Sequence, residues 1–108
     1  DVISSAGYRI GPTEVEASLM EHPAVLEAAV VGKPDKTKGE IVKAYIVLND
    51  SYKGSDELSQ ELSLFVKNKL SKHQYPKEIE FVDSLPKTQS GKTQRFILKK
   101  KEYEKVNR

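Results

Sequence analysis

Residues 25–31 are apolar at almost every position, and no other stretch constrains the fold of this chain so strongly. In an extended strand, successive side chains point to opposite faces of the sheet. Both alternating sets are mostly apolar here, with Leu26, Ala28 and Val30 in one set and Val25, Ala29 and Val31 in the other. This pattern predicts a strand that is covered on both faces.

Residues 41–48 and 56–70 predict a second strand and a helix. The strand segment places Lys43 on one face and an apolar set on the other, made of Val42, Ala44, Ile46 and Leu48. The helix segment carries an apolar stripe at helical spacing, made of Leu58, Leu62, Phe65, Val66 and Leu70. Ser55 is its predicted N-cap. Residues 32–39 are rich in turn formers and are predicted to form a loop between the two strands.

Shorter elements complete the chain. Two β-like pieces are interrupted by Ser5-Ala6-Gly7-Tyr8, so residues 1–10 are predicted to form a tight loop or hairpin. Gly11-Pro12 opens a helix, because proline is tolerated at the first helical position. A short strand at 79–82 and a basic helix from about Arg95 follow. The expected fold is α+β, with a small three-stranded sheet flanked by helices and preceded by the short hairpin or loop.

Length and charge limit what the chain can do by itself. With 108 residues it is one domain, residues 1–108, and it begins at Asp1 without an initiator methionine, so we expect a piece of a longer protein. The net charge of +2 argues little for nucleic acid. Lys and Arg gather in the C-terminal third, which suits one polyanionic small ligand better than a long phosphate backbone.

The cysteine count and the apolar runs suggest a compartment. The chain has no cysteine, so disulfides and thiol chemistry are excluded. No apolar run approaches the length of a membrane span or a signal peptide. We therefore predict a cytoplasmic location, no membrane partner and no nucleic-acid partner.

The stretch from Pro86 to Thr93, PKTQSGKT, is the most suggestive motif for chemistry. It ends like a phosphate-binding loop, G-x-x-x-x-G-K-S/T, but Pro86 stands where the first glycine belongs and has no amide hydrogen to offer. A second interpretation places Lys92 at the tip of a mobile turn. An ammonium group about 4 Å from a phosphate oxygen gains roughly 4 kcal/mol at an effective dielectric near 20, and it can stabilise charge in a transition state.

Other candidate sites are weaker. His22 and His73 are the only histidines and have no acidic or thiol partners at ligand spacing, so no metal site is predicted. In residues 72–77, Tyr75-Pro76 forms a rigid extended edge flanked by lysines. That edge could stack an adenine or line a narrow tunnel, and it could equally be an ordinary connection between a helix and a strand.

Three segments together resemble one family. Residues 1–16 resemble the signature D-V/I/L-I-x-x-x-G-Y/H/E-R-I-x-P-x-E-I/V-E of adenylate-forming enzymes, and residues 86–92 resemble their C-terminal motif P-K-T-x-S/T-G-K. Residues 22–35 give a third match. This superfamily includes acyl-CoA synthetases, nonribosomal-peptide adenylation domains and luciferases. Residues 72–77 and 99–102 look most like short- and medium-chain acyl-CoA synthetases.

The resemblance implies that the chain is the C-terminal lid of a two-domain ligase. In such enzymes a large N-terminal domain binds ATP, Mg2+ and the carboxylic acid. The lid first brings the motif lysine, here Lys92, to the forming acyl-AMP as pyrophosphate leaves. It then rotates about a hinge, which should lie just before Asp1, and coenzyme A (CoA) attacks the acyl carbon. The chain alone should therefore be inactive.

Further roles carry over one residue at a time. Lys92 is the expected catalytic residue, and it is expected to bind nucleotide together with Arg9. The expected CoA-binding residues are Ala6, Gly7, Tyr8, Lys38, Lys67, Tyr75, Pro76 and Lys77. Ala6 departs from the serine or glycine common at its position. Gly7 would let the backbone approach a narrow thiol chain that a Cβ would obstruct.

Two other functions stay open from the sequence alone. The lid could serve the phosphopantetheine of a carrier protein in place of free CoA. From a different class, the chain could be a non-catalytic module that binds nucleotides or RNA, although only Tyr75 and its lysines offer the necessary aromatic and basic surface.

Overall fold

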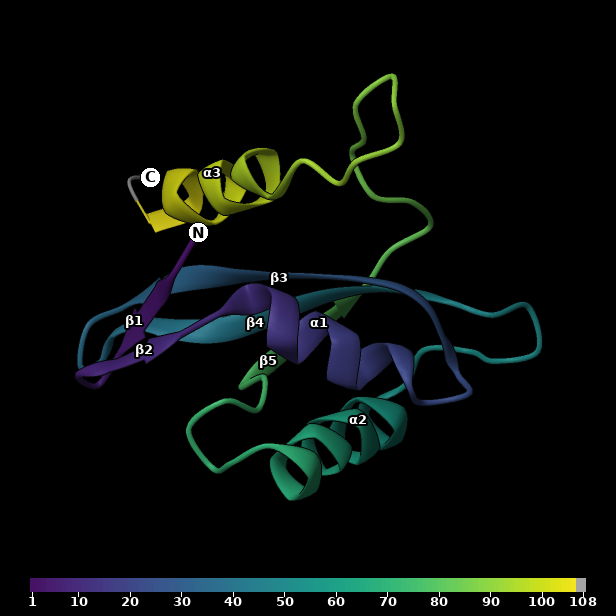
Figure 1. Cartoon of the computed structure of the whole chain (residues 1–108), viewed down its shortest axis with the longest axis horizontal. Coiled ribbons are helices and arrows are strands. Elements are labelled where there is room, and N and C mark those ends of the chain that lie inside the picture. The colour runs from purple at the N-terminus through teal and green to yellow at the C-terminus, as the bar shows by residue number, and fades with distance from the viewer. Residues whose placement is uncertain (107–108) are drawn as a thin grey trace.

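The structure is a computed structural model that describes residues 1–106. Its elements along the chain are β1 (Ile3–Ser5), β2 (Tyr8–Ile10), α1 (Pro12–Met20), β3 (Val25–Asp35), β4 (Gly39–Leu48), α2 (Asp56–Lys69), β5 (Glu78–Phe81) and α3 (Arg95–Val106). Figure 1 shows the sheet lying between α3 on one side and α1 and α2 on the other. The α+β prediction is confirmed.

Strand β4 organises the whole sheet. It pairs antiparallel with β3 along one side, from Val25↔Leu48 to Asp35↔Gly39. Along its other side it pairs first with β1, at Ser5↔Gly39, and then in parallel with β5, from Lys43↔Glu78 onward. The predicted hairpin, β1 and β2, therefore joins the sheet, which has five strands in the described part of the chain and not three.

The predicted loop at residues 32–39 is mostly strand. Only residues 36–38 form the turn, where the Asp35 carboxylate accepts hydrogen bonds from the amides of Thr37 (3.2 Å) and Lys38 (2.9 Å). Proline at position 34 is tolerated because β3 is an edge strand, where a missing amide donor breaks no essential ladder.

Both faces of β3 and β4 are covered, as the apolar pattern of residues 25–31 predicted. One core cluster packs the sheet against α1 and α2 and includes Val15, Leu19, Val30, Val42, Ala44, Ile46, Leu62 and Val66. A second packs the opposite face against α3 and includes Ala29, Val31, Tyr45, Val47, Leu85 and Leu98. The Ser55 cap is confirmed, since its hydroxyl accepts a hydrogen bond from the Leu58 amide at 3.1 Å.

A buried ionic cluster fastens α3 to the sheet. Lys43 on β4 is only 1% exposed, and its ammonium lies 2.7 Å from Glu102, 2.9 Å from Glu80 and 3.0 Å from Glu78. Tyr45 donates a further hydrogen bond to Glu102. Burial opposes the charge on Glu102, but the hydrogen bonds from Lys43 and Tyr45 outweigh it and lower the pKa of Glu102 to about 2. Burial likewise opposes the charge on Lys43, and its carboxylate partners raise its pKa.

Candidate functional site

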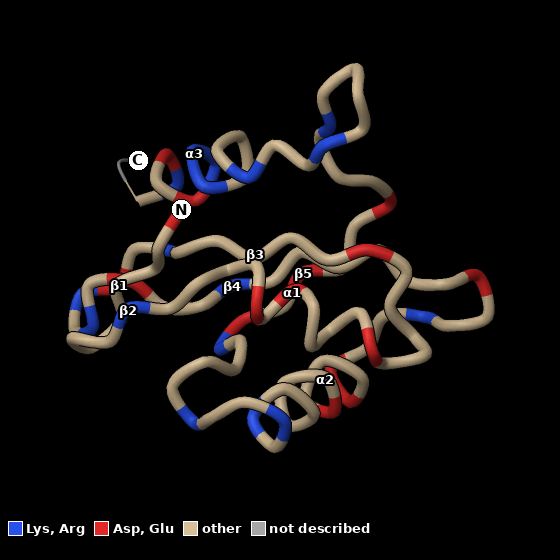
Figure 2. The backbone as a smooth tube through the Cα atoms, viewed as in Figure 1, with Lys and Arg blue, Asp and Glu red and all other residues tan. Residues whose placement is uncertain are grey.

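The segments predicted to bind CoA meet at the first residues of β4. The Ala6 amide at the β1–β2 tip donates to the Lys38 carbonyl at 2.9 Å, and the Lys77 amide donates to the Val42 carbonyl at 2.8 Å. Three parts of the chain that are distant in sequence are thus attached to one end of one strand. Figure 2 shows Lys and Arg gathered at this end of the molecule.

The hairpin tip has a backbone that explains its glycine. Ala6 has φ 50° and Gly7 has φ 86°, so both central residues of the turn have the positive φ that a type I′ hairpin turn requires. A Cβ on Gly7 would meet nothing within 4 Å. The turn alone therefore accounts for glycine, while the uncovered backbone leaves room for the close approach of a ligand.

Two adjoining hollows contain most of the predicted CoA residues. The smaller, of about 50 Å³, is lined by Ser5, Ala6, Tyr8, Lys38, Lys72, His73 and Lys77. The larger, of about 360 Å³, is lined by Ser59, Gln60, Ser63, Leu64, Lys67, Tyr75, Pro76 and Lys77. Lys77 lines both, so the structure brings the residues predicted from separate motifs into one continuous surface.

Positive charge surrounds the ring of Tyr75. The ammonium of Lys77 lies 3.7 Å from the ring centroid and that of Lys67 lies 5.4 Å from it. A hydrogen bond from Lys77, together with the charges of Lys77, Lys67 and Lys38, lowers the pKa of the Tyr75 hydroxyl. An aromatic face with ammonium groups around it suits a ligand that carries both a base and phosphates.

No sequence pattern predicts the contact between Tyr8 and His73. Their rings are stacked, with centroids 3.6 Å apart and planes 20° from parallel. The sequence predicts no metal site at His73 and places Lys72 only in the basic segment of residues 72–77. No periodicity or motif links residues so distant in the chain, so only the folded structure could reveal this contact.

Lys92 lies on a separate loop, which Figure 1 shows projecting away from the sheet on the side of α3. The loop is closed by internal hydrogen bonds: Thr88 amide to Lys92 carbonyl (2.8 Å), Gly91 amide to Thr88 carbonyl (2.9 Å) and Gln94 amide to Pro86 carbonyl (2.9 Å). The Lys92 amide donates to the Thr88 hydroxyl at 3.1 Å. Because these four amides already donate hydrogen bonds within the loop, they are not available to wrap a phosphate as the amides of a P-loop do.

The two predicted nucleotide contacts are not neighbours within this chain. Lys92 is exposed on its loop, whereas Arg9 is exposed on β2, opposite Ser4 in the β1–β2 ladder. A nucleotide could contact both Lys92 and Arg9 only in different orientations of this domain, or with another part of a protein lying between the two residues.

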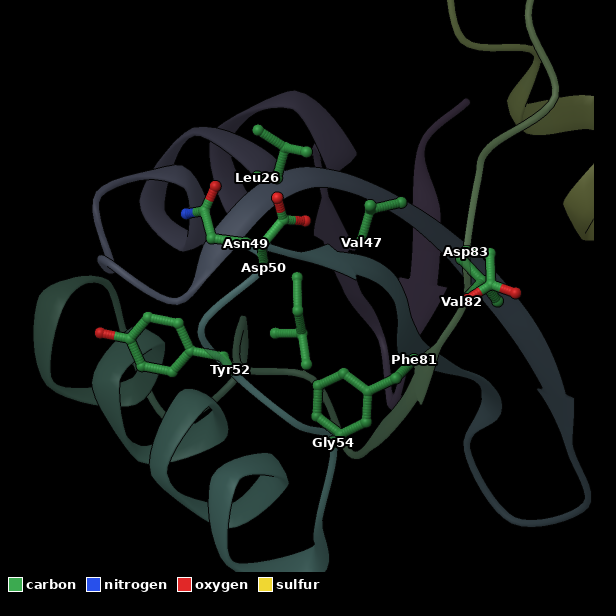
Figure 3. A pocket seen from close by; sticks show the side chains of 10 residues that line it. Leu26, Val47, Asn49, Asp50, Tyr52, Gly54, Phe81, Val82 and Asp83 are labelled. Carbon is green, nitrogen blue, oxygen red and sulfur yellow. The ribbon is translucent and has the colours of Figure 1, made fainter.

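A different cavity, of about 460 Å³, lies at the carboxyl end of β4 (Figure 3). Its lining is Leu26, Val47, Leu48, Asn49, Asp50, Tyr52, Gly54, Phe81, Val82 and Asp83. It contains none of the predicted residues, and its two aspartates do not suit a polyanion. We therefore place the candidate site at the start of β4 and on the Lys92 loop.

The described part of the chain contains neither a metal-binding cluster nor a membrane-spanning helix. Among residues 1–106 there is no group of three His, Cys, Asp or Glu side chains placed to hold a metal ion. Over the same range, none of the helices has the length and apolar character needed to cross a membrane.

Comparison with known proteins identifies the family. Residues 14–92 match the family model for the AMP-binding enzyme C-terminal domain, and the chain belongs to this family. The acetyl-coenzyme A synthetase of Bacillus subtilis is 56% identical over 99 residues, covering 92% of this chain and 17% of that protein. Human mitochondrial acyl-coenzyme A synthetase ACSM3 is 52% identical over 108 residues, covering 98% of this chain and 18% of that protein.

A solved structure agrees. The crystal structure of a Brucella canis acyl-CoA synthetase superposes with a TM-score of 0.96 at 58% identity, covering 98% of this chain and 20% of that one. The family resemblance found in the sequence is thereby confirmed. The chain spans less than a fifth of the length of the two curated relatives.

Proposed function

We propose that the chain is the C-terminal lid of an AMP-forming acyl-CoA synthetase, with residues 1–108 as the lid and a large N-terminal domain as its partner. The observation that carries the proposal is the separation of two sets of predicted residues on one domain. Lys92 stands on one projecting loop, and the predicted CoA residues surround the start of β4. Such a domain can present one set or the other to a shared active site, depending on its orientation.

In the first half-reaction, a carboxylate oxygen attacks the α-phosphorus of ATP, and the bond to the departing pyrophosphate breaks. Lys92 brings its ammonium to the oxygens on which negative charge develops. This contact requires no proton transfer, and its contribution grows where water is excluded. Arg9 is assigned to the nucleotide, because a guanidinium group suits phosphate and ribose oxygens.

In the second half-reaction, the CoA thiolate attacks the acyl carbon, and AMP leaves with the electrons of the broken acyl–phosphate bond. Ala6, Gly7 and Tyr8 are assigned to the pantetheine end of CoA. Lys38, Lys67 and Lys77 are assigned to its phosphates, and Tyr75 with Pro76 to its base. Mg2+ is assigned to the N-terminal domain, since the described residues offer it no cluster of ligands.

Reciprocal substitutions in the full-length protein test the assignment. Lys92→Ala should lower acyl-AMP formation, followed by ATP–pyrophosphate exchange, by about 10²–10³-fold, the usual effect of removing one donor to transition-state charge. It should spare thioester formation from supplied acyl-AMP. Lys77→Ala should leave pyrophosphate exchange unchanged and raise the KM for CoA by about tenfold, the order expected for one charge-assisted contact. Equal losses in both half-reactions for either variant would contradict the division of roles.

The thiol acceptor is tested separately. Because three lysines converge near Tyr75, we assign free CoA as the acceptor, and 3′-dephospho-CoA should then show a raised KM. Equal KM values for the two thiols would favour a carrier protein. The pocket that selects the carboxylic acid is assigned to the N-terminal domain. The cytoplasmic location stays a prediction from the sequence.

A further inference from the structure

Ion pairs hold both ends of the loop that carries Lys92. At its first residues, Lys87 pairs with Glu27 on β3. After it, Arg95 pairs with Glu16 on α1. We call these two pairs the loop clamp. Neither pair has a role in the chemistry proposed above.

The Arg95–Glu16 pair is the stronger half of the clamp. The guanidinium Nε lies 2.7 Å from Oε2 of Glu16, and a terminal nitrogen lies 2.6 Å from Oε1. Two parallel hydrogen bonds fix both position and plane, which a lysine could not do. Only 25% of the Arg95 side chain and 14% of the Glu16 side chain are exposed, so solvent screens the pair less than it would a pair at the surface.

Glu16 is itself held by a third element. Its Oε2 accepts a hydrogen bond from the Val30 amide of β3 at 2.8 Å. A second terminal nitrogen of Arg95 reaches the Asp1 carboxylate at 3.3 Å. The Arg95 guanidinium therefore ties the start of α3 to α1 and to the beginning of the chain, and through the Glu16 carboxylate also to β3.

The clamp acts at a short distance from Lys92. Arg95 is the first residue of α3, and it follows Gln94, whose amide closes the loop on the Pro86 carbonyl. The internal hydrogen bonds give the loop its shape. They do not fix its orientation relative to the sheet, and that orientation depends on what holds each end.

We propose that Arg95 and Glu16 are positioning residues for acyl-AMP formation, because they fix the direction in which the loop presents Lys92. This inference rests on the proposed function. Displacing a catalytic group by about 1 Å can cost about 10²-fold in rate. Arg95→Ala should therefore lower acyl-AMP formation in the full-length protein by about 30–100-fold and change thioester formation from supplied acyl-AMP by less than about threefold.

Three further variants complete the test. Glu16→Gln should cause the same selective loss of acyl-AMP formation. Arg95→Lys should retain more of this activity than Arg95→Ala, because lysine keeps the positive charge but cannot make the two parallel hydrogen bonds to Glu16. Lys99→Ala is the matched control: Lys99 lies one turn further along α3 and pairs with Glu40 at 3.5 Å, so its removal should spare both half-reactions.

A double substitution separates positioning from general stability. If Arg95 acts only through Lys92, Arg95→Ala should add little to the loss already caused by Lys92→Ala. Additive losses, or equal losses in both half-reactions, would overturn the proposal. So would full acyl-AMP formation by Arg95→Ala.

Hydrogen exchange tests the clamp without any enzyme assay. In Arg95→Ala, the Gln94 amide, whose hydrogen bond to the Pro86 carbonyl closes the loop beside Arg95, should exchange at least about tenfold faster, and in Lys99→Ala it should exchange as in the parent protein. Unchanged exchange would show that the ion pair does not hold the loop. If Lys92→Ala left acyl-AMP formation intact, the proposed role of Lys92 would fail, while this measurement would still decide whether the pair restrains the loop.

Discussion

Replacing Glu102 by glutamine should reveal how much the buried ionic cluster contributes to stability. The carboxylate is completely buried, and its pKa is about 2, against an ordinary value of 4.5. At about 1.4 kcal/mol per pKa unit, this difference corresponds to about 3 kcal/mol of folding free energy. Because the pKa is lower in the folded state, the contribution is complete above pH 4.5 and is lost as the pH falls toward 2.

The assay is urea unfolding followed by circular dichroism at several pH values between 7 and 2. Glu102→Gln should be less stable than the parent chain by about 3 kcal/mol at neutral pH, and the difference should shrink as the parent carboxylate becomes protonated. Glu104→Gln, an exposed position on the same helix, is the matched control and should change stability by less than about 0.5 kcal/mol.

The comparison cancels the carboxylates outside the cluster, which titrate equally in both proteins, so a pH-dependent difference reports on Glu102 and on the two carboxylates that share Lys43 with it, Glu78 and Glu80. A stability difference between Glu102→Gln and the parent that stays constant across this pH range would mean that the charge of Glu102 is not what stabilises α3. A difference below about 0.5 kcal/mol at neutral pH would lead to the same conclusion.

Two further substitutions test other parts of the fold. In Gly32→Ala, the new Cβ would stand 2.6 Å from the Glu40 carboxylate, which accepts a hydrogen bond from Tyr103 at 2.6 Å. Displacing that carboxylate should destabilise the chain by about 1–3 kcal/mol. The hydrogen bond to Glu40 raises the pKa of Tyr103 to about 12. Without that bond, the pKa of Tyr103 should fall toward its ordinary value of 10.0. Ultraviolet titration of tyrosine measures this, and an unchanged titration would exclude the contact. Ser55→Ala removes the hydroxyl that caps α2 and should lower the free energy of unfolding by about 1 kcal/mol, measured as a lower melting temperature. Ser55→Gly should lower it by only a few tenths of a kcal/mol. Equal losses in the two variants would argue against capping.

The predictions from sequence succeeded where neighbouring residues decide the outcome. Apolar alternation identified the strand covered on both faces, and the stripe with its serine cap identified α2. The loop prediction for residues 32–39 was wrong, because turn-forming residue types near Pro34 were weighed without knowing that β3 would lie at an edge of the sheet. Local sequence cannot show which side of a strand will have no partner.

Contacts between distant residues escaped prediction for a related reason. Alternation placed Lys43 opposite the apolar face, but nothing near it in the chain indicated that Glu102 would cover it. The stack of Tyr8 on His73 was equally invisible. The family motifs, by contrast, predict a set of site residues from separate parts of the chain, and most of the predicted CoA residues line the two adjoining hollows.

The central position of β4 also sets the order in which parts of the candidate site should form during folding. β3 and β4 are joined by a turn of a few residues, so their pairing closes a short loop. β1 and β5 each reach β4 across a long stretch of chain, and closing such loops loses more entropy and takes more time. The hairpin tip and residues 72–77 should therefore dock onto an existing β3–β4 hairpin. Substitutions there should accelerate unfolding and leave the refolding rate nearly unchanged in stopped-flow experiments, so the end of this domain that is predicted to bind CoA can vary in sequence with little risk to the folding nucleus.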